Sequence, residues 1–160
     1  MAPAPSKPDQ RSTSIEQNID QNIDQNIEQT IDETIDETSV AFANHIGIKL
    51  DHASPDQVSG RLAIRPELCN HGPHIHGGAL MAFADFLGAI GAHLNIPDDK
   101  TNSTTIESKT NFLKSGNLGD TLLGTAIPLS RGRRLSVWQT EITRSDGTRV
   151  AIVTQTQMYL

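Results

Sequence analysis

Hydrophobic and polar residues follow three different patterns along this chain. Between residues 15 and 38, isoleucine recurs every four residues among acidic, amide and threonine residues, as in I-E-Q-N and I-D-E-T. From residue 79 to residue 94 nearly every position is apolar, which is typical of a helix buried on every side. Much of the remaining chain alternates apolar and polar positions, as β-strands do. The pattern predicts a repetitive tail, one buried helix and several strands.

Turn signals divide the alternating stretches into six strands. The expected strands cover residues 46–52, 57–65, 102–113, 120–130, 134–144 and 149–160, and a short helix is expected at 39–45. Gly/Asn, Arg-Gly-Arg and Ser-Asp-Gly turns separate the last four strands, so we expect long antiparallel hairpins there. Pro128 predicts an edge position or a bulge, because proline has no N–H for a central ladder.

One antiparallel sheet and one long apolar helix define the expected fold. Such a sheet has one apolar face to cover, and only the helix at 79–94 is available to cover it. The sheet should therefore curl around the helix. The expected fold class is α+β, with a domain at residues 39–160 preceded by a separate tail at 1–38.

The tail is expected to be acidic and disordered. An isoleucine every four residues drifts by about 40° per repeat around a helix, so it gives no stable apolar seam. A weakly helical or partner-dependent segment remains the alternative. Residues 1–14 are rich in proline and polar residues, and they have nothing to bury.

Charge is divided in the same way as the hydrophobic pattern. Residues 1–38 hold nine acidic and two basic residues, net −7, so the rest of this −6 chain carries net +1. No basic face is visible, which argues against a nucleic-acid partner. Cys69 is the single cysteine and no leader pattern is visible, so a reducing, cytoplasmic location is expected. The apolar helix is shorter than a membrane span and contains Asp85 and His93, so no membrane partner is expected.

Asp85 is the first candidate for chemistry, because it is the only carboxylate in the apolar stretch. Burying an unpaired carboxylate is costly, so either a local hydrogen bond or a function must retain it. Gly77 and Gly78 stand where the helix should begin, and they leave the N–H groups of its first turn open to a ligand oxygen. Those donors would stabilise a carbonyl oxygen that gains negative charge. The combination indicates attack on a carbonyl group.

The spacing of these residues implies a second subunit. Gly77 and Asp85 are eight residues apart, which corresponds to about 12 Å along a helix. They cannot contact one small carbonyl group from the same chain. If both belong to one site, the helices of two subunits must lie antiparallel in a two-fold dimer.

The chain resembles the acyl-CoA thioesterases of the hotdog fold, in particular the PaaI-like and 4-hydroxybenzoyl-CoA thioesterase branches. The resemblance covers about residue 40 to residue 160. It rests on Asn70, His76-Gly77-Gly78, Asp85, T-T-I-E-S-K-T-N-F-L, Gly119-Asp120, Gly132-Arg133 and Asp146-Gly147. It implies a curved sheet wrapped around a central helix, and hydrolysis of acyl-CoA thioesters to free acid and CoA.

The resemblance also implies a role for each matching residue. Asp85 would be the base or nucleophile, and the Gly77 N–H would contact the carbonyl across a homodimer that pairs into a dimer of dimers. Asn70 and His76 would position substrate or water. Further substrate contacts are expected from Gly78, Thr105 and Arg133, the last because guanidinium groups bind the phosphates of CoA well. The chain departs from the family pattern at Ala89, where the 4-hydroxybenzoyl-CoA branch has a hydroxyl residue, and at Ser115-Gly116.

Three alternatives follow from the same residues. His71, His74 and His76 could bind zinc with Asp85, but the H-x-x-H-x-H spacing does not match common ligand pairings, so we expect no metal and no cofactor. A non-catalytic module that binds or senses acyl-CoA or fatty acid is the second functional hypothesis. A hotdog hydratase is the third, although the usual Asp-x-Asn-Pro-x-His type of signature is absent.

Overall fold

The computed structural model describes residues 40–160, so the expectations for residues 1–38 lie outside the described part. The elements are α2 (Ala41–Ile46), β1 (Ile48–Ala53), β2 (Val58–Ala63), the 3-10 helix η1 (Pro66–Leu68), α3 (Gly77–His93), β3 (Ser103–Phe112), β4 (Thr121–Arg131), β5 (Leu135–Arg144) and β6 (Arg149–Tyr159). The six expected strands and both expected helices are confirmed. The short helix η1 was not predicted from the sequence; Pro66 stands in its first turn, where a missing N–H has no cost.

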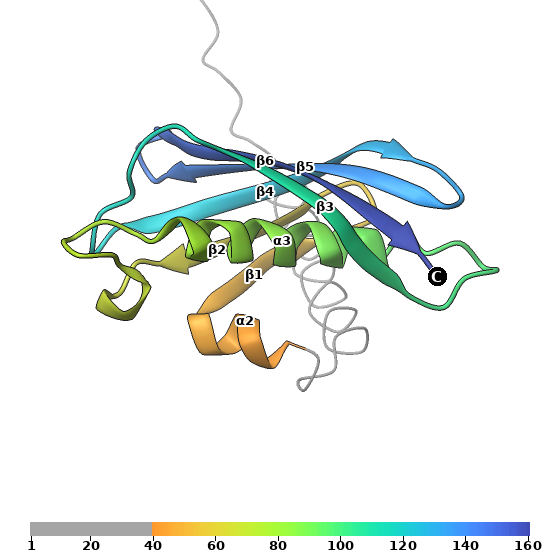
Figure 1. Ribbon diagram of the computed structural model, residues 1–160, viewed down its shortest axis with the longest axis horizontal. Helices are drawn as coiled ribbons and strands as arrows, with labels where there is room; N and C mark the ends of the chain where they lie inside the picture. The colour runs from red at the N-terminus through yellow and green to blue at the C-terminus, as the bar shows by residue number, and fades with distance from the viewer. Residues whose placement is uncertain (1–39) are drawn as a thin grey trace, which may run out of the picture. The chain divides into compact units, whose positions relative to one another are not determined.

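All six strands form one antiparallel sheet in the order β1-β2-β4-β5-β6-β3. The sheet curves over α3, as Figure 1 shows, so the predicted α+β hotdog architecture is confirmed. The hairpins β4–β5 and β5–β6 form as predicted. A hairpin between β3 and β4 was also predicted, and this was wrong. Both edges of β4 are occupied by β2 and β5, and β3 pairs with β6 instead.

Pro128 lies in the central strand β4, at a position beyond the end of its pairing with β2. The ladder between β2 and β4 ends at Ala126, so the absent N–H of Pro128 breaks no hydrogen bond on that side. The register between β4 and β5 shifts between Pro128 and Ser130. The predicted bulge is therefore confirmed. The alternative, an edge strand, was wrong, because β4 is a central strand whose pairing with β2 ends before Pro128.

Large side chains fill the space between α3 and the sheet. Phe83 and Leu87 of α3 are fully buried, as are Leu122 of β4 and Trp138 and Ile142 of β5. Each such side chain stabilises the fold by about 1.5–3 kcal/mol relative to an exposed one. The core thus fixes the face that α3 turns toward the sheet.

The prediction that α3 is buried on every side was wrong. Met81 is 39% exposed, and Ala82, Asp85, Phe86 and Ala89 are only half-buried. One sheet covers one side of a helix, so the opposite side of α3 stays open in a single chain. Within residues 40–160, no helix has both the length and the apolar character that crossing a membrane requires.

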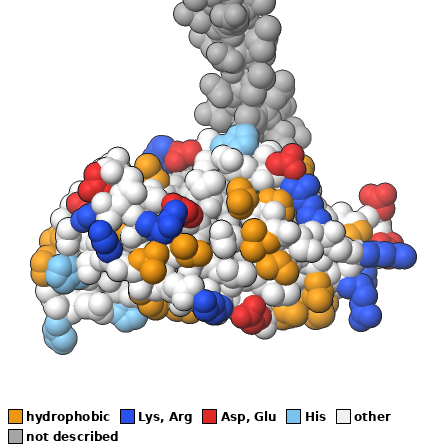
Figure 2. Space-filling view, turned by 90° about the horizontal axis from the view of Figure 1, so that it is seen from above, with side chains coloured by type: hydrophobic (Ala, Val, Ile, Leu, Met, Phe, Trp, Pro, Cys, Tyr) orange, Lys and Arg blue, Asp and Glu red, His pale blue; other side chains and the backbone are white. Residues whose placement is uncertain are grey.

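The outer side of the sheet also exposes large hydrophobic side chains. They come from β4 and β5 and include Leu123, Ile127, Leu129 and Leu135. Hydrophobic side chains gather in several places among charged ones on the face of the molecule drawn in Figure 2. These strands therefore offer apolar surface outside the core.

Candidate active site

A small loop leads into α3 and carries two of the predicted site residues. Cys69 and Ile75 form an isolated bridge, and the Asn70 N–H donates to the His74 carbonyl at 2.9 Å. The His76 N–H donates to the Leu68 carbonyl at 2.7 Å. These bonds close the loop on itself just before the helix begins. The Asn70 and His76 side chains are both exposed there.

His76 caps the helix with its ring. Its Nδ1 accepts a hydrogen bond from the Gly78 N–H at 2.8 Å, so in the neutral ring the proton resides on Nε2. The Gly78 N–H is therefore already used within the chain. Among residues 40–160, no group accepts a hydrogen bond from the Gly77 N–H. Of the two glycine donors predicted at the helix start, Gly77 is the one that can bind a ligand oxygen.

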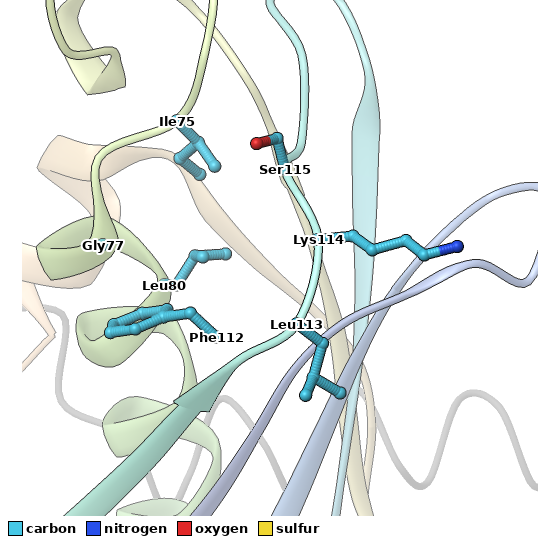
Figure 3. Close-up of a pocket in the computed structure, with 7 residues that line it drawn as sticks. All are labelled: Ile75, Gly77, Leu80, Phe112, Leu113, Lys114 and Ser115. Carbon is cyan, nitrogen blue, oxygen red and sulfur yellow. The ribbon is translucent and has the colours of Figure 1, made fainter.

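Gly77 borders a pocket of about 410 Å³, within the size range of small-molecule sites. The pocket is lined by Ile75, Gly77, Leu80, Phe112, Leu113, Lys114 and Ser115. Figure 3 shows the Phe112 ring lying beside α3, next to Leu80, whereas Lys114 points away from the helix. A Cβ atom at Gly77 would lie 3.0 Å from Cζ of Phe112. The ring and the helix backbone can approach this closely because the residue is glycine.

The Asp85 carboxylate is held through one of its two oxygens. The Thr105 hydroxyl of β3 donates to Oδ1 at 2.9 Å. Gln155 of β6 points its Nε2 at the same oxygen, at 3.4 Å, and at the Asp85 main-chain carbonyl, at 3.3 Å. Within the described residues, neither of these donors, nor any other, donates a hydrogen bond to Oδ2. One oxygen is thus anchored by two donors, and the other accepts no hydrogen bond within the described residues.

The structure brings Thr105 to Asp85 but keeps Gly77 apart from both. Gly77 and Asp85 lie on the same helix, eight residues apart, which corresponds to about 12 Å. A carbonyl group held at one of them cannot reach the other in the same chain. Within a single chain, the Gly77 N–H and the Asp85 carboxylate therefore cannot act on the same carbonyl group.

Arg133 lies away from the other predicted site residues, in the turn between β4 and β5. Its guanidinium donates to the carboxylate of Asp99 at 3.0 Å, in the loop that follows α3. That hydrogen bond is the main reason why the pKa of the Asp99 carboxyl is lowered, and it also raises the pKa of the Arg133 guanidinium. Both side chains are well exposed. Arg133 makes no hydrogen bond to any other predicted site residue in the described part.

The histidines of the loop before α3 do not gather around a metal position. His71 and His74 are exposed, and Nδ1 of His74 lies 3.1 Å from Oδ1 of Asn117. No group of three or more His, Cys, Asp or Glu side chains in residues 40–160 is arranged to hold a metal ion. The structure offers no observation in favour of the zinc alternative.

Two buried glutamines lie in this region and were not predicted from the sequence. Gln155 and Gln157 of β6 are 0% and 1% exposed, respectively. They share the inward side of the strand with Val153 and Tyr159. Two glutamines in the buried phase of an alternating strand are the signal that could have identified them, because buried polar side chains need partners.

Comparison with known proteins defines the class of this protein. The chain belongs to the thioesterase superfamily, whose family model matches residues 72–151, half of its length. It is therefore a thioesterase with the hotdog fold, and the predicted enzyme class is confirmed.

Individual relatives agree with this class. A candidate esterase of Mycobacterium tuberculosis, Rv1847, is 30% identical over 107 residues, which are 66% of this chain and 76% of that protein. The structure of the same protein is similar with a TM-score of 0.72 and 26% identity, and the match covers 76% of this chain and 97% of that one. The 1,4-dihydroxy-2-naphthoyl-CoA thioesterase 2 of Arabidopsis thaliana is 25% identical over 103 residues, 64% of each chain. The structure of PaaI from Escherichia coli shares the fold, with a TM-score of 0.69, 22% identity, and coverage of 75% and 84%.

Proposed function

We propose that this protein hydrolyses acyl-CoA thioesters to free acid and CoA, with Asp85 as the base or nucleophile. The observation that carries the proposal is the asymmetric anchoring of Asp85, whose Oδ1 accepts from Thr105 while Oδ2 has no donor in the described residues. The CoA thioesterase of Arabidopsis thaliana among its relatives supports a CoA ester as the substrate.

The second part of the proposal is that the Gly77 N–H polarises the thioester carbonyl. This N–H lies at the start of α3 and has no acceptor among residues 40–160. A donor at the positive end of a helix stabilises the oxyanion that forms when the carbonyl carbon is attacked. Oδ2 of Asp85 would either take a proton from the attacking water or bond to the carbonyl carbon itself. In the second case CoA leaves as thiolate, and water then hydrolyses the resulting anhydride.

The third part is that the two halves of the site come from two subunits. Gly77, Met81, Asp85 and Ala89 follow one another at intervals of four residues, so they form a stripe that turns by about 40° per step along the less buried side of α3. Met81 lies midway between Gly77 and Asp85. A two-fold axis that brings Gly77 of one subunit to Asp85 of the other therefore also brings the two Met81 residues together. Met81 is also 39% exposed in the single chain, as expected for a hydrophobic residue at such an axis.

The remaining predicted residues have supporting places in this arrangement. Asn70 and His76, in the loop before α3, would position substrate or water. The apolar pocket beside Gly77 would hold part of the thioester, and Gly78 would shape the helix start, since its N–H is used by His76. Arg133 would meet the phosphates of CoA. The exposed leucines and isoleucine of β4 and β5 would form the contact between two dimers.

Replacement of Asp85 by asparagine tests the proposal. Asp85→Asn keeps the shape of the side chain and removes its basicity, so kcat should fall by about 10²–10⁴-fold. The measurement is release of free thiol from a panel of short, long and aromatic acyl-CoA esters. Asp51→Asn is the matched control, because Asp51 is an exposed carboxylate of β1 paired with Arg61, and it should keep wild-type turnover. Near-normal turnover by Asp85→Asn on every ester would reject the proposal.

A further inference from the structure

A chain of hydrogen bonds crosses three elements to reach Asp85. Nε2 of Gln157 lies 2.8 Å from the Thr105 hydroxyl, which in turn lies 2.9 Å from Oδ1 of Asp85. Gln157 and Thr105 are directly opposed in the ladder between β6 and β3. The Gln157 side chain is 1% exposed. It cannot exchange its protein partner for bulk water without moving.

The direction of each bond in this chain follows from proton counting. The Thr105 hydroxyl has one proton, and an ionised carboxylate can only accept. Thr105 must therefore donate to Asp85, which leaves its oxygen only the role of acceptor toward Gln157. The amide oxygen of Gln157 would compete for the same proton, so the NH₂ group must face Thr105. With the NH₂ group on that side, the Thr105 proton has no acceptor at Gln157, so Gln157 and Asp85 together fix the direction of the hydroxyl.

Gln155 approaches Asp85 from the same strand. Its Nε2 faces two acceptors of Asp85, the main-chain carbonyl and Oδ1. The side chain is fully buried, and its Oε1 has no hydrogen-bond partner in the described part of the chain. A buried amide oxygen without a donor is unfavourable for stability. An apolar residue would avoid that penalty, so stability alone does not account for glutamine here.

We propose that Gln157 and Gln155 are positioning residues that fix the Asp85 carboxylate for thioester hydrolysis. Gln157 acts through Thr105, because it turns the hydroxyl proton toward Oδ1. Gln155 acts directly, because it holds the main chain and Oδ1 of the same residue. Together they commit Oδ1 to the protein and leave Oδ2 as the reacting oxygen. This inference rests on the proposed function of Asp85.

The test combines variants of Gln157 and Thr105. Gln157→Met removes the donor while keeping a side chain of similar length, and Thr105→Val removes the hydroxyl while keeping the shape. Each should lower kcat by about tenfold with KM nearly unchanged, because Thr105→Val removes a hydrogen bond to the charged carboxylate and Gln157→Met removes the bond that orients the Thr105 hydroxyl. The double variant should be no slower than Thr105→Val alone, because Gln157 acts through that hydroxyl. Thr105→Ser, which keeps the hydroxyl, should retain near wild-type kcat.

Thr140→Val is the matched control for a buried hydroxyl on the inner face of the sheet. The Thr140 hydroxyl faces the main-chain carbonyl of Ala84 at 3.5 Å and has no bond to the Asp85 carboxylate. This variant should keep wild-type kcat. Thermal unfolding of every variant shows whether a loss of activity follows a loss of folded protein.

Two results would overturn the inference. One is wild-type kcat in Thr105→Val, which can be tested even where Gln157→Met does not fold. The other is a Gln157→Met effect that is as large in the Thr105→Val background as in the wild type. Gln157→Glu provides a second variant, because its carboxylate would compete for the Thr105 proton and should lower kcat at least as much. Failure of the proposed function is distinguishable, since Asp85→Asn would then remain active whatever these variants do.

Discussion

At the scale of single residues, two adjacent backbone N–H groups have different chemical roles. The N–H of Gly78 is used by the ring of His76, whereas the N–H of Gly77 has no acceptor among residues 40–160. The His76 ring thus caps the helix start by binding the Gly78 N–H and leaves the Gly77 N–H as a donor at a defined position. In the proposed reaction that single donor faces the thioester oxygen.

Two substitutions of Gly77 separate its N–H from its lack of a side chain. Gly77→Pro deletes the N–H at the first helical position, where proline is tolerated, and His76 already has the extended backbone that precedes proline, with ψ 136°. Gly77→Ala adds a Cβ atom against the exposed Phe112 ring but keeps the N–H. We expect kcat to fall by about 10²–10³-fold in the proline variant and far less in the alanine variant. Equal thiol-release rates for the two variants would contradict a donor role for Gly77.

At the scale of elements, the two sides of α3 differ in how closely they are packed. The stripe from Gly77 to Ala89 stays open, while the other side packs closely against the sheet. A Cβ atom at Gly88 would lie 2.5 Å from Cδ of Gln155, and one at Gly91 would lie 2.5 Å from Cζ3 of Trp138. The two glycines let β6 and β5 approach the same helix, but only the first of these contacts leads to Asp85.

Alanine substitutions at these two glycines should therefore differ in their effect on the reaction. Both variants force a buried side chain to move, so each should lose about 1–3 kcal/mol of unfolding free energy. Gly88→Ala should also lower the kcat of the folded protein by about tenfold, because it displaces Gln155 from Asp85. Gly91→Ala should keep the kcat of its folded fraction. Denaturant unfolding and thiol release measured on the same samples give both quantities, and equal kcat values would contradict a role for the Gln155 contact.

Most of these elements could be predicted from the sequence because their signals are local. Alternation and turn residues located the strands within a few residues, and the apolar stretch located α3. The pairing of β3 with β6 could not be predicted in this way, since it joins residues 103–112 to residues 149–159. The roles of Gln155 and Gln157 depend on that pairing, so they were missed as well. The burial of α3 was overestimated because a hydrophobic pattern does not show how much of a helix the chain itself covers, and here one sheet covers one side of it.

At the scale of the whole molecule, the proposed site exists only between subunits. Asp85 with Thr105 and the glutamines forms one half, and the start of α3 with its pocket forms the other. In a two-fold dimer each half occurs twice and the two sites are equivalent. A substitution that disables one of these two parts in a single subunit therefore affects only one of the two sites.

Mixing two inactive variants tests this arrangement. A hybrid of Asp85→Asn and Gly77→Pro subunits would contain one site with both defects and one site with neither. After subunit exchange, thiol release should recover to about a quarter of the wild-type value, because half of the dimers are hybrids with one working site. Each variant alone should stay inactive, and so should the chain that carries both changes. Hybrid dimers detected by mass spectrometry without recovery of thiol release would show that each site lies within one chain.

The ion pair between Arg133 and Asp99 makes the structure near the C-terminal end of α3 more sensitive to salt than the region around Asp85. It joins the β4–β5 turn to the loop after α3 through two full charges in contact with water. Dissolved ions weaken such a contact, since the screening length is about 8 Å at physiological ionic strength and shorter in concentrated electrolyte. The bonds from Thr105, Gln155 and Gln157 are partly buried, so they are screened less. High salt should therefore weaken the contact between the β4–β5 turn and the loop after α3. The proposed reacting carboxylate of Asp85 should keep its orientation.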